Sequence, residues 1–375
     1  MTAPIAFSYL TQMNDKGASD LYLTLGHVPV MRINDELVSL DGNPLTSDEI
    51  NDIIQSILTA KQRRDFEINW ELNTSLDMGP HGRFRVNILK QRQSPGLVIR
   101  RIVSRIPTLT DLRLPSILEK LALEKRGLVL LTGMTGSGKS TTLASMVDTR
   151  NKQKTGHILT IEDPIEYYHE HKKSVVTQRE VGVDTESYSV ALKNSLRQRP
   201  DVILIGEIRD REVMNQALTI AETGHLCLAT LHTNNAYQAI ERIVNFFPEE
   251  QQGQVRLNLS MNLKAIVSQR LLPCLSGGLV PALEIMINEA LVRELIVKGQ
   301  YEKITDIMEQ NNPMGMCTFD QSLLSLFSQG LIDEETVISQ SDKSSDMKVK
   351  LQQVKMGMQN ADLSDMDTSL LSISE

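Results

Sequence analysis

The chain has 375 residues, of which 41% are hydrophobic and 23% are charged, and its formal net charge is −8. This length suits two domains and a tail, the composition is that of a globular protein, and the acidic balance argues against a dedicated nucleic-acid binder. The three scattered cysteines form no Cys-x-x-Cys pair, so they indicate neither a disulfide framework nor a zinc site.

Residues 1–105 are expected to form a compact α/β domain. Four strands are predicted there, at 21–25, 30–34, 83–89 and 96–103. A helix is predicted to begin at Thr46 or Ser47, because isoleucines follow at helical spacing as far as Ile57. Residues 106–115 contain two prolines and little periodicity, and they are interpreted as an interdomain linker.

A different pattern holds over residues 116–275. Short, continuously apolar runs alternate with helical segments, and these runs lie at 128–131, 158–161, 202–205 and 226–231. Continuous apolar strands with helices between them indicate a parallel sheet covered on both faces. Residues 276–338 are predicted to be mostly helical. Residues 339–375, poor in large apolar groups, are predicted to form a weakly ordered tail with a helix near 346–357.

Residues 133–140 match the phosphate-binding loop pattern GxxxxGK[ST] in full. An apolar strand precedes the loop and a good helix former follows it, which is the context that the motif requires. Lys139 is expected to reach the β- and γ-phosphates of ATP, and the Ser140 hydroxyl to ligate Mg²⁺. The alternative is a glycine-rich turn that happens to contain Lys-Ser, which the flanking segments disfavour. The predicted nucleotide contacts are Gly133, Thr135, Gly136, Ser137, Gly138, Lys139, Ser140 and Thr141.

A second apolar strand, 202–205, is followed by Glu207. Ligands bind at the carboxyl edge of open α/β sheets, and this carboxylate is predicted to lie there. Glu207 is therefore the predicted acid beside Mg²⁺, acting directly or through a bound water. The alternative is a solvated acidic loop.

A third apolar strand, 158–161, ends in an acidic cluster of Glu162, Asp163 and Glu166. These carboxylates could share the coordination of the metal and the polarisation of the attacking water, and Glu166 is the preferred general base. Acidic turns are common at protein surfaces, so three surface acids in a turn remain the alternative.

Positive and proton-carrying groups are also available. His232 follows the strand 226–231 and can lie beside the γ-phosphate, although a structural histidine is equally consistent. The transition-state charge needs a cation, often an arginine from a neighbouring domain or subunit. The candidate arginines are Arg83, Arg85, Arg100, Arg101 and Arg209, and for each of them a solvated side chain is the alternative.

Four motifs in this order resemble the secretion superfamily of P-loop ATPases, and within it the type IV pilus retraction ATPases of the PilT and PilU family. They are the Walker A loop at 132–142, the Asp box at 161–166, the Walker B strand at 199–210 and the His box at 221–234. The resemblance spans about residues 5–335. It implies a PAS-like N-terminal domain, a RecA-like ATPase domain and a homo-hexameric ring that binds ATP at each interface. It also implies that Arg83, and Arg100 or Arg101, reach across to a nucleotide.

The branch of the family is indicated by what the chain lacks. Assembly ATPases usually carry a four-cysteine module after the His box, and here the equivalent stretch holds only Cys274. The helix at 290–299, Met134 and the tail beyond Leu331 depart from PilT and resemble the PilU side of the family. These departures leave open whether such a protein retracts pili alone or only beside a PilT-like ring.

The sequence thus predicts a cytoplasmic, Mg²⁺-dependent ATPase at the inner-membrane pilus base that drives retraction and twitching motility. Its expected partners are a PilT-like ATPase and the inner-membrane platform protein, without nucleic acid or membrane insertion, since about 18 consecutive apolar residues occur nowhere. The alternatives are a regulatory subunit with little turnover, an assembly ATPase of pili or type II secretion, and a nucleic-acid translocase, which the acidic charge disfavours. Steady-state ATPase activity and salt-dependent DNA binding discriminate among them.

Overall fold

The computed structural model describes residues 5–34, 36–79, 82–102, 105–310 and 315–355. The chain divides into two compact units. The first holds residues 1–106 together with two segments from later in the chain, 163–170 and 179–187. The second holds residues 107–162, 171–178 and the chain from 188 onward.

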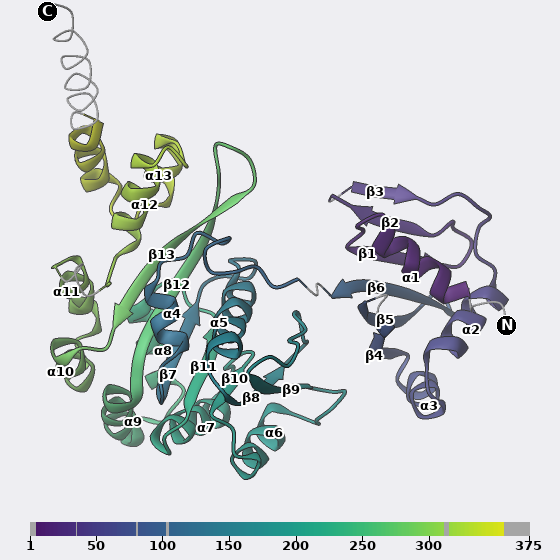
Figure 1. Ribbon diagram of the computed structural model, residues 1–375, viewed down its shortest axis with the longest axis horizontal. Helices are drawn as coiled ribbons and strands as arrows, with labels where there is room; N and C mark the ends of the chain where they lie inside the picture. Colours follow the sequence, from purple (N-terminus) through teal and green to yellow (C-terminus); the bar gives the residue numbers. More distant parts are fainter. Residues whose placement is uncertain (1–4, 35, 80–81, 103–104, 311–314, 356–375) are drawn as a thin grey trace, which may run out of the picture. The chain divides into compact units, whose positions relative to one another are not determined.

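The first unit is built on a six-stranded sheet of order β3-β2-β1-β6-β5-β4, in which every pairing is antiparallel (Figure 1). Its strands are β1 (Asp20–Thr24), β2 (Val30–Ile33), β3 (Glu36–Ser39), β4 (Glu71–Asp77), β5 (Arg83–Gln91) and β6 (Ser94–Ile102). Its helices are α1 (Ile5–Asp15), α2 (Ser47–Ile57) and α3 (Ala60–Asn69). Phe84, Val86 and Ile88 alternate with less buried residues along β5, so one face of the sheet packs with α1 and α2 into a core.

Helix α2 begins where the sequence predicts it. The hydroxyl of Thr46 accepts a hydrogen bond from the backbone N–H of Glu49, and the carboxylate of Glu49 accepts one from the backbone N–H of Thr46. This reciprocal capping box satisfies two backbone donors that the helix cannot pair internally. The predicted helix start is confirmed, with Thr46 as the cap.

The second unit contains a seven-stranded sheet of order β13-β12-β7-β11-β10-β8-β9. Strands β8, β10, β11, β7 and β12 pair in parallel, and β13 joins β12 antiparallel. The strands are β7 (Gly127–Thr132), β8 (Gly156–Glu162), β9 (Ser174–Glu180), β10 (Val202–Ile205), β11 (Leu226–Leu231), β12 (Leu263–Pro273) and β13 (Leu279–Ile287). The predicted parallel sheet is confirmed, and with it the mixed α/β fold of an N-terminal domain and a RecA-like domain.

In the second unit, helices follow β7, β10 and β11 directly along the chain, and further helices come after the β12–β13 hairpin (Figure 1). The helices of this unit are α4 (Ile117–Ala122), α5 (Lys139–Gln153), α6 (Tyr188–Ser195), η2 (Leu196–Gln198), α7 (Arg211–Glu222), α8 (Ala236–Asn245), α9 (Glu249–Asn262), α10 (Ala290–Lys298), η3 (Tyr301–Lys303), α11 (Ile304–Gln310), α12 (Phe319–Ser328) and α13 (Glu334–Gln340). In the described part of the chain, no helix is long and apolar enough to cross a membrane.

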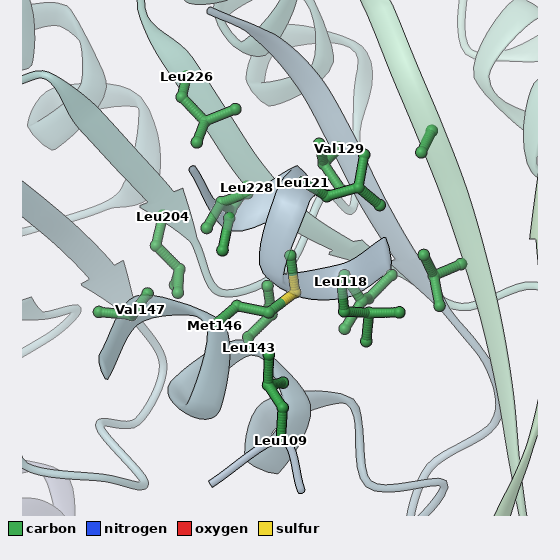
Figure 2. Close-up of a cluster of buried hydrophobic side chains, with 14 of the residues drawn as sticks. Leu109, Leu118, Leu121, Val129, Leu143, Met146, Val147, Leu204, Leu226 and Leu228 are labelled. Carbon is green, nitrogen blue, oxygen red and sulfur yellow. The ribbon is translucent and has the colours of Figure 1, made fainter. Parts of the chain in front are cut away.

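Buried side chains from strands and helices form one apolar cluster beneath the sheet of the second unit. Figure 2 shows Val129, Leu204 and Leu228 from the strands facing Leu143 and Met146 of α5. Each strand side chain buried in this way contributes about 1.5–3 kcal/mol relative to an exposed one. The cluster therefore fixes α5, and the loop that precedes it, against the sheet.

Two segments differ from the sequence-based prediction, and a third agrees with it in part. The region expected to be helical from 276 opens with a strand, β13, because its apolar residues pair with β12. The expected linker, 106–115, contributes the buried side chains Leu109 and Leu114 to the apolar cluster. The helix expected near 346–357, within the weakly ordered tail, is present over the described residues 344–355, and Met347 and Leu351 are fully buried against α12 and α13. Residues 356–375 lie outside the described part of the chain.

Candidate nucleotide-binding site

The parallel pairing gathers several predicted residues at one edge of the second sheet. β7, β11, β10 and β8 run in the same direction, so their carboxyl ends share this edge. The phosphate-binding loop follows β7, and His232 follows β11, its neighbour. Glu207 lies two residues beyond β10, and Glu162 is the last residue of β8. This is the edge at which open α/β sheets bind ligands.

The phosphate-binding loop has the backbone that its glycines permit. Gly133, Gly136 and Gly138 have φ values of 147°, 80° and 83°, in the region that favours glycine. Helix α5 begins directly after the loop, at Lys139. The loop is thus followed by a helix N-terminus, whose positive dipole end and backbone N–H groups favour a bound anion.

Lys139 is folded across the loop and is only 7% exposed. Its Nζ donates hydrogen bonds to the carbonyl oxygens of Gly133 and Met134, each at 2.8 Å. A phosphate oxygen would offer this ammonium group a charge-assisted bond, which is stronger than a bond to a neutral carbonyl. Ser140 and Thr141 follow at the first turn of α5 and are half-buried, whereas Thr135 and Gly136 are exposed at the tip of the loop.

The interior of the loop fits a phosphate group. The hydroxyl oxygen of Ser137 is buried and has no hydrogen-bond partner among the described residues. A Cβ atom added at Gly133 would lie 2.5 Å from that oxygen, closer than any real contact. A buried polar atom without a partner is costly, so an added acceptor such as a phosphate oxygen would be favourable here.

Glu207 and His232 are in direct contact. The Nε2 atom of His232 lies 3.2 Å from one carboxylate oxygen of Glu207, and the Nε atom of Arg209 donates to the other at 2.7 Å. His232 is 37% exposed, so the pair lies at the surface of the second unit. The sequence-predicted acid, histidine and arginine are therefore brought together at one point of the sheet edge.

The three residues of the predicted acidic cluster are divided between the two units. Glu162 lies in the second unit, where its carboxylate accepts hydrogen bonds from Thr160 and Gln178. Asp163 and Glu166 belong to the first unit, and both are exposed. Their role at a nucleotide stays a prediction.

The candidate arginines of the first unit lie on two paired strands. Arg83 is on β5 and pairs with Asp77 at 2.7 Å. Arg100 and Arg101 are on β6, and Arg100 pairs with the buried Asp20 at 2.8 Å. These side chains have partners within their own unit, so their reach toward a nucleotide also stays a prediction.

Sequence reasoning missed a cavity beside the loop. A space of about 340 Å³ is bordered by Gly138, Thr141 and Thr142 on one side and by Arg113, Leu271 and Cys274 on the other. This volume is within the usual range for small-molecule pockets. The signal in the sequence was slight, because only Gly138, Thr141 and Thr142 belong to a motif and most of the lining comes from distant segments of the chain.

A larger cavity of about 800 Å³ lies on another side of the loop. It is bordered by the loop residues 133–137, the start of α8, and Arg270 and Glu284 from the β12–β13 hairpin. Burial raises the pKa of Glu284 to about 7, against the opposing effect of its hydrogen bond from the backbone of Ala236. Within the described residues, no group of three or more His, Cys, Asp or Glu side chains is arranged to hold a metal ion.

Comparison with known proteins agrees with this architecture. The family model described as "Type II/IV secretion system protein" matches residues 70–310. The chain is 49% identical to the type IV pilus ATPase PilU of Pseudomonas aeruginosa, over 94% of this chain and 91% of the relative. It is 43% identical to the type IV pilus retraction ATPase PilT of the same organism, over 85% of this chain and 93% of the relative.

A solved structure extends the likeness to three dimensions. The crystal structure of the pilus retraction motor PilT with bound ADP superposes with a TM-score of 0.85 at 43% identity, covering 92% of this chain and 98% of that one. The fold and the relatives define the class: a P-loop enzyme that binds nucleotide and hydrolyses ATP. The chain belongs to the type II/IV secretion system protein family, and within it to the PilT/PilU group of pilus ATPases.

Proposed function

We propose that this protein is a ring-forming motor ATPase that drives retraction of a type IV pilus, acting beside a PilT-type motor. The observation that carries the proposal is the sheet edge where Lys139 closes the phosphate-binding loop and Glu207 contacts His232 on the adjacent strands. The 49% identity to a PilU protein over nearly the whole chain supports the cellular role. The departures of the sequence from PilT support the accessory position.

Nucleotide binding is assigned to the loop and the first turn of α5. Lys139 would exchange its carbonyl partners for β- and γ-phosphate oxygens. Mg²⁺, when bound, neutralises charge on these phosphates. The Ser140 hydroxyl and the Glu207 carboxylate are the residues that would hold it, Glu207 directly or through water.

Activation of the attacking water is assigned to the acidic cluster. Glu166 is the general base, and Glu162 and Asp163 help to orient water and metal. His232 would place a donor near the terminal phosphate.

The cation for the transition state is assigned to the first unit. Arg83, and Arg100 or Arg101, would come from a neighbouring protomer of a hexamer, as arginine fingers do in other phosphoryl-transfer enzymes. Closing and opening of the two units around each nucleotide would convert hydrolysis into rigid-body motion.

The nucleobase of the bound nucleotide is assigned to the 340 Å³ cavity, because this cavity is bordered by Thr141 and Thr142, directly after the phosphate-binding loop. Cys274 in its wall offers a test. A hydrogen bond with Ser276 and the charge of Arg113 lower the pKa of this thiol, whereas burial raises the pKa of Cys227 to about 12. Alkylation should therefore modify Cys274 first, and ADP should slow it at least severalfold. Equal rates of Cys274 alkylation with and without ADP would contradict this placement of the nucleobase.

The cellular proposal places the protein in the cytoplasm at the inner-membrane pilus base, in contact with the platform protein and without nucleic acid. Deletion of the encoding gene tests it. If the protein drives retraction, the deletion strain should have more surface pili and should lose twitching motility. Absent pili would indicate an assembly ATPase instead, and an ATP turnover near zero in the purified protein, restored only by a partner ring, would indicate a regulatory subunit.

A further inference from the structure

Strand β12 runs beside β7 and extends past the point where the phosphate-binding loop begins. Ser268 is the pairing partner of Thr132, the last residue of β7. Gln269 is the next residue, level with the first glycine of the loop, and this residue is only 3% exposed. A buried amide must find partners for its donors and its acceptor.

Gln269 finds these partners in the nucleotide-binding segment. Its Nε2 donates a 2.8 Å hydrogen bond to the carbonyl oxygen of Ser137, inside the loop. Its Oε1 accepts a 2.8 Å hydrogen bond from the hydroxyl of Thr142, in the first turn of α5. One side chain thus joins the loop to the helix that follows it, and both bonds are buried.

The contact is so close that the loop can hold no side chain toward Gln269. A Cβ atom at Gly133 would lie 2.4 Å from the carbonyl oxygen of Gln269, and one at Gly138 would lie 2.8 Å from its Nε2. Both glycines of the motif therefore face the same residue of β12. The loop therefore needs glycine at these two positions because of the close approach of Gln269, as well as for phosphate binding.

The bond to Ser137 has a consequence for the next residue. The peptide group between Ser137 and Gly138 is planar and trans, so its C=O and N–H point in opposite directions. With the C=O held toward Gln269, the N–H of Gly138 is directed away from β12. We propose that Gln269 is a positioning residue for nucleotide binding, which orients the Ser137–Gly138 peptide so that its N–H can donate to a phosphate. This inference rests on the assignment of the loop as the nucleotide site.

The sharpest test is Gln269→Glu, which keeps the size of the side chain and replaces the donor by an oxygen. This oxygen would face the Ser137 carbonyl, so the peptide loses its anchor. We expect the dissociation constant for fluorescently labelled ADP to rise about 10-fold, the effect of one lost hydrogen bond. The KM for ATP should rise by a similar factor with little change in kcat, as expected when ground-state and transition-state binding are lost equally.

Gln252→Glu is the matched control. Gln252 also donates through its amide to a backbone carbonyl, that of Phe247, at 3.2 Å, but it lies on α9. It should bind ADP as the wild type does. A second variant, Thr142→Val, removes only the bond to Oε1 and should weaken ADP binding less than Gln269→Glu.

Hydrogen exchange in the absence of nucleotide tests directly whether Gln269 holds the Ser137–Gly138 peptide in place. Exchange at the Gly138 amide should quicken in Gln269→Glu and stay unchanged in Gln252→Glu. ADP affinity within twofold of the wild type, or a loss accounted for by an equal rise in the unfolded fraction, would overturn the inference. If Gln269→Glu does not fold, Gln269→Met removes both bonds without adding charge, and the same outcomes apply. A wild-type protein that fails to bind ADP would instead overturn the assignment of the site, while the exchange data would still decide the role of Gln269.

Discussion

The two sheets of this protein organise polar residues in opposite ways. In the antiparallel sheet of the first unit, neighbouring strands end at opposite edges, and Arg85 lies across from Arg100 between β5 and β6. Like charges in opposite positions are unfavourable, and the buried Asp20 pairs with Arg100 from β1. In the parallel sheet of the second unit, the central strands β7, β10 and β11 are buried throughout, and the loops that follow them meet at one edge.

This difference explains where the chemistry can be built within one chain. A parallel sheet assembles residues from distant motifs without help, so Glu207 and His232 meet although 25 positions separate them in sequence. In the antiparallel sheet, the candidate arginines lie on the strands β5 and β6 and not in loops that meet at one edge, so a nucleotide would have to be brought to them. The first unit is thus expected to act on nucleotide only in an assembly, and the following changes test that division of labour.

The largest effect is expected for Lys139→Ala in the second unit. It removes the ammonium group that closes the loop, and turnover of ATP should fall at least about 100-fold, the usual cost of losing one charge-stabilising group. Steady-state ATPase assays measure the loss, and circular dichroism checks the fold. Lys152→Ala, on the same helix but 47% exposed and paired with Asp148, is the control and should keep its activity. An unchanged rate in Lys139→Ala would contradict the site.

Glu207→Gln and Glu166→Gln compare the contributions of the two units directly. Each should retain ADP binding and lose turnover by about 100-fold. For Glu166 this is within the range for a base in proton transfer, and for Glu207 it reflects the loss of the carboxylate that would hold Mg²⁺. Glu207 contacts His232, so its variant should also change the NMR chemical shifts of that imidazole. Exposed Glu222→Gln serves as the control. Wild-type turnover in either acid variant would remove that residue from the mechanism.

The sequence made the parallel sheet and its edge predictable because the signals are local. Apolar runs such as 202–205 lie buried on both faces, and the glycine loop needs a strand before it and a helix after it. The expectation for 276–338 was less accurate, since β13 is recognisable only from its pairing with β12. β12 itself was missed because Ser268 and Gln269 interrupt its apolar run with polar residues.

The interrupting residues are those that support the site, which is why sequence periodicity could not reveal them. Gln269 contacts Ser137 and Thr142 across more than 120 positions of chain, and no spacing rule connects them. The placement of the arginines is a different case. Whether these arginines reach a nucleotide depends on how protomers assemble, and no local pattern in the sequence of one chain predicts that assembly.

A smaller effect is expected for Glu284→Gln, beneath the edge of the parallel sheet. Burial raises the pKa of Glu284 from 4.5 to about 7, so the folded protein keeps a proton that the unfolded chain releases. Because the unfolded chain ionises at this position first, the free energy of unfolding falls as the pH rises from about 4.5 to about 7, and it levels off above the folded pKa. Glutamine cannot ionise, and its stability relative to the wild type should rise across this window by up to about 3 kcal/mol.

Denaturant unfolding at pH 5, 6, 7 and 8 measures this difference. The charges near Glu284 come from Asp342, which raises its pKa further, and from Arg270, which opposes that rise. Exposed Glu250→Gln is the control, for which no such rise is expected. A constant difference between Glu284→Gln and the wild type at all four pH values would show that Glu284 does not titrate in this range.

The smallest effect on stability is expected in the antiparallel sheet, for Arg100→Ala. The side chain of Arg100 is 68% exposed, although its partner Asp20 is buried at 6%. An exposed ion pair contributes about 1 kcal/mol or less, and Ser19 still donates a hydrogen bond to Asp20. The free energy of unfolding should therefore fall only slightly, as it should for Arg64→Ala on α3. ATP turnover separates the two variants: if strand arginines act on a nucleotide in an assembly, Arg100→Ala loses activity that Arg64→Ala keeps. Equal turnover in both would confine the role of Arg100 to its own sheet and leave Arg83 and Arg101 as the candidates.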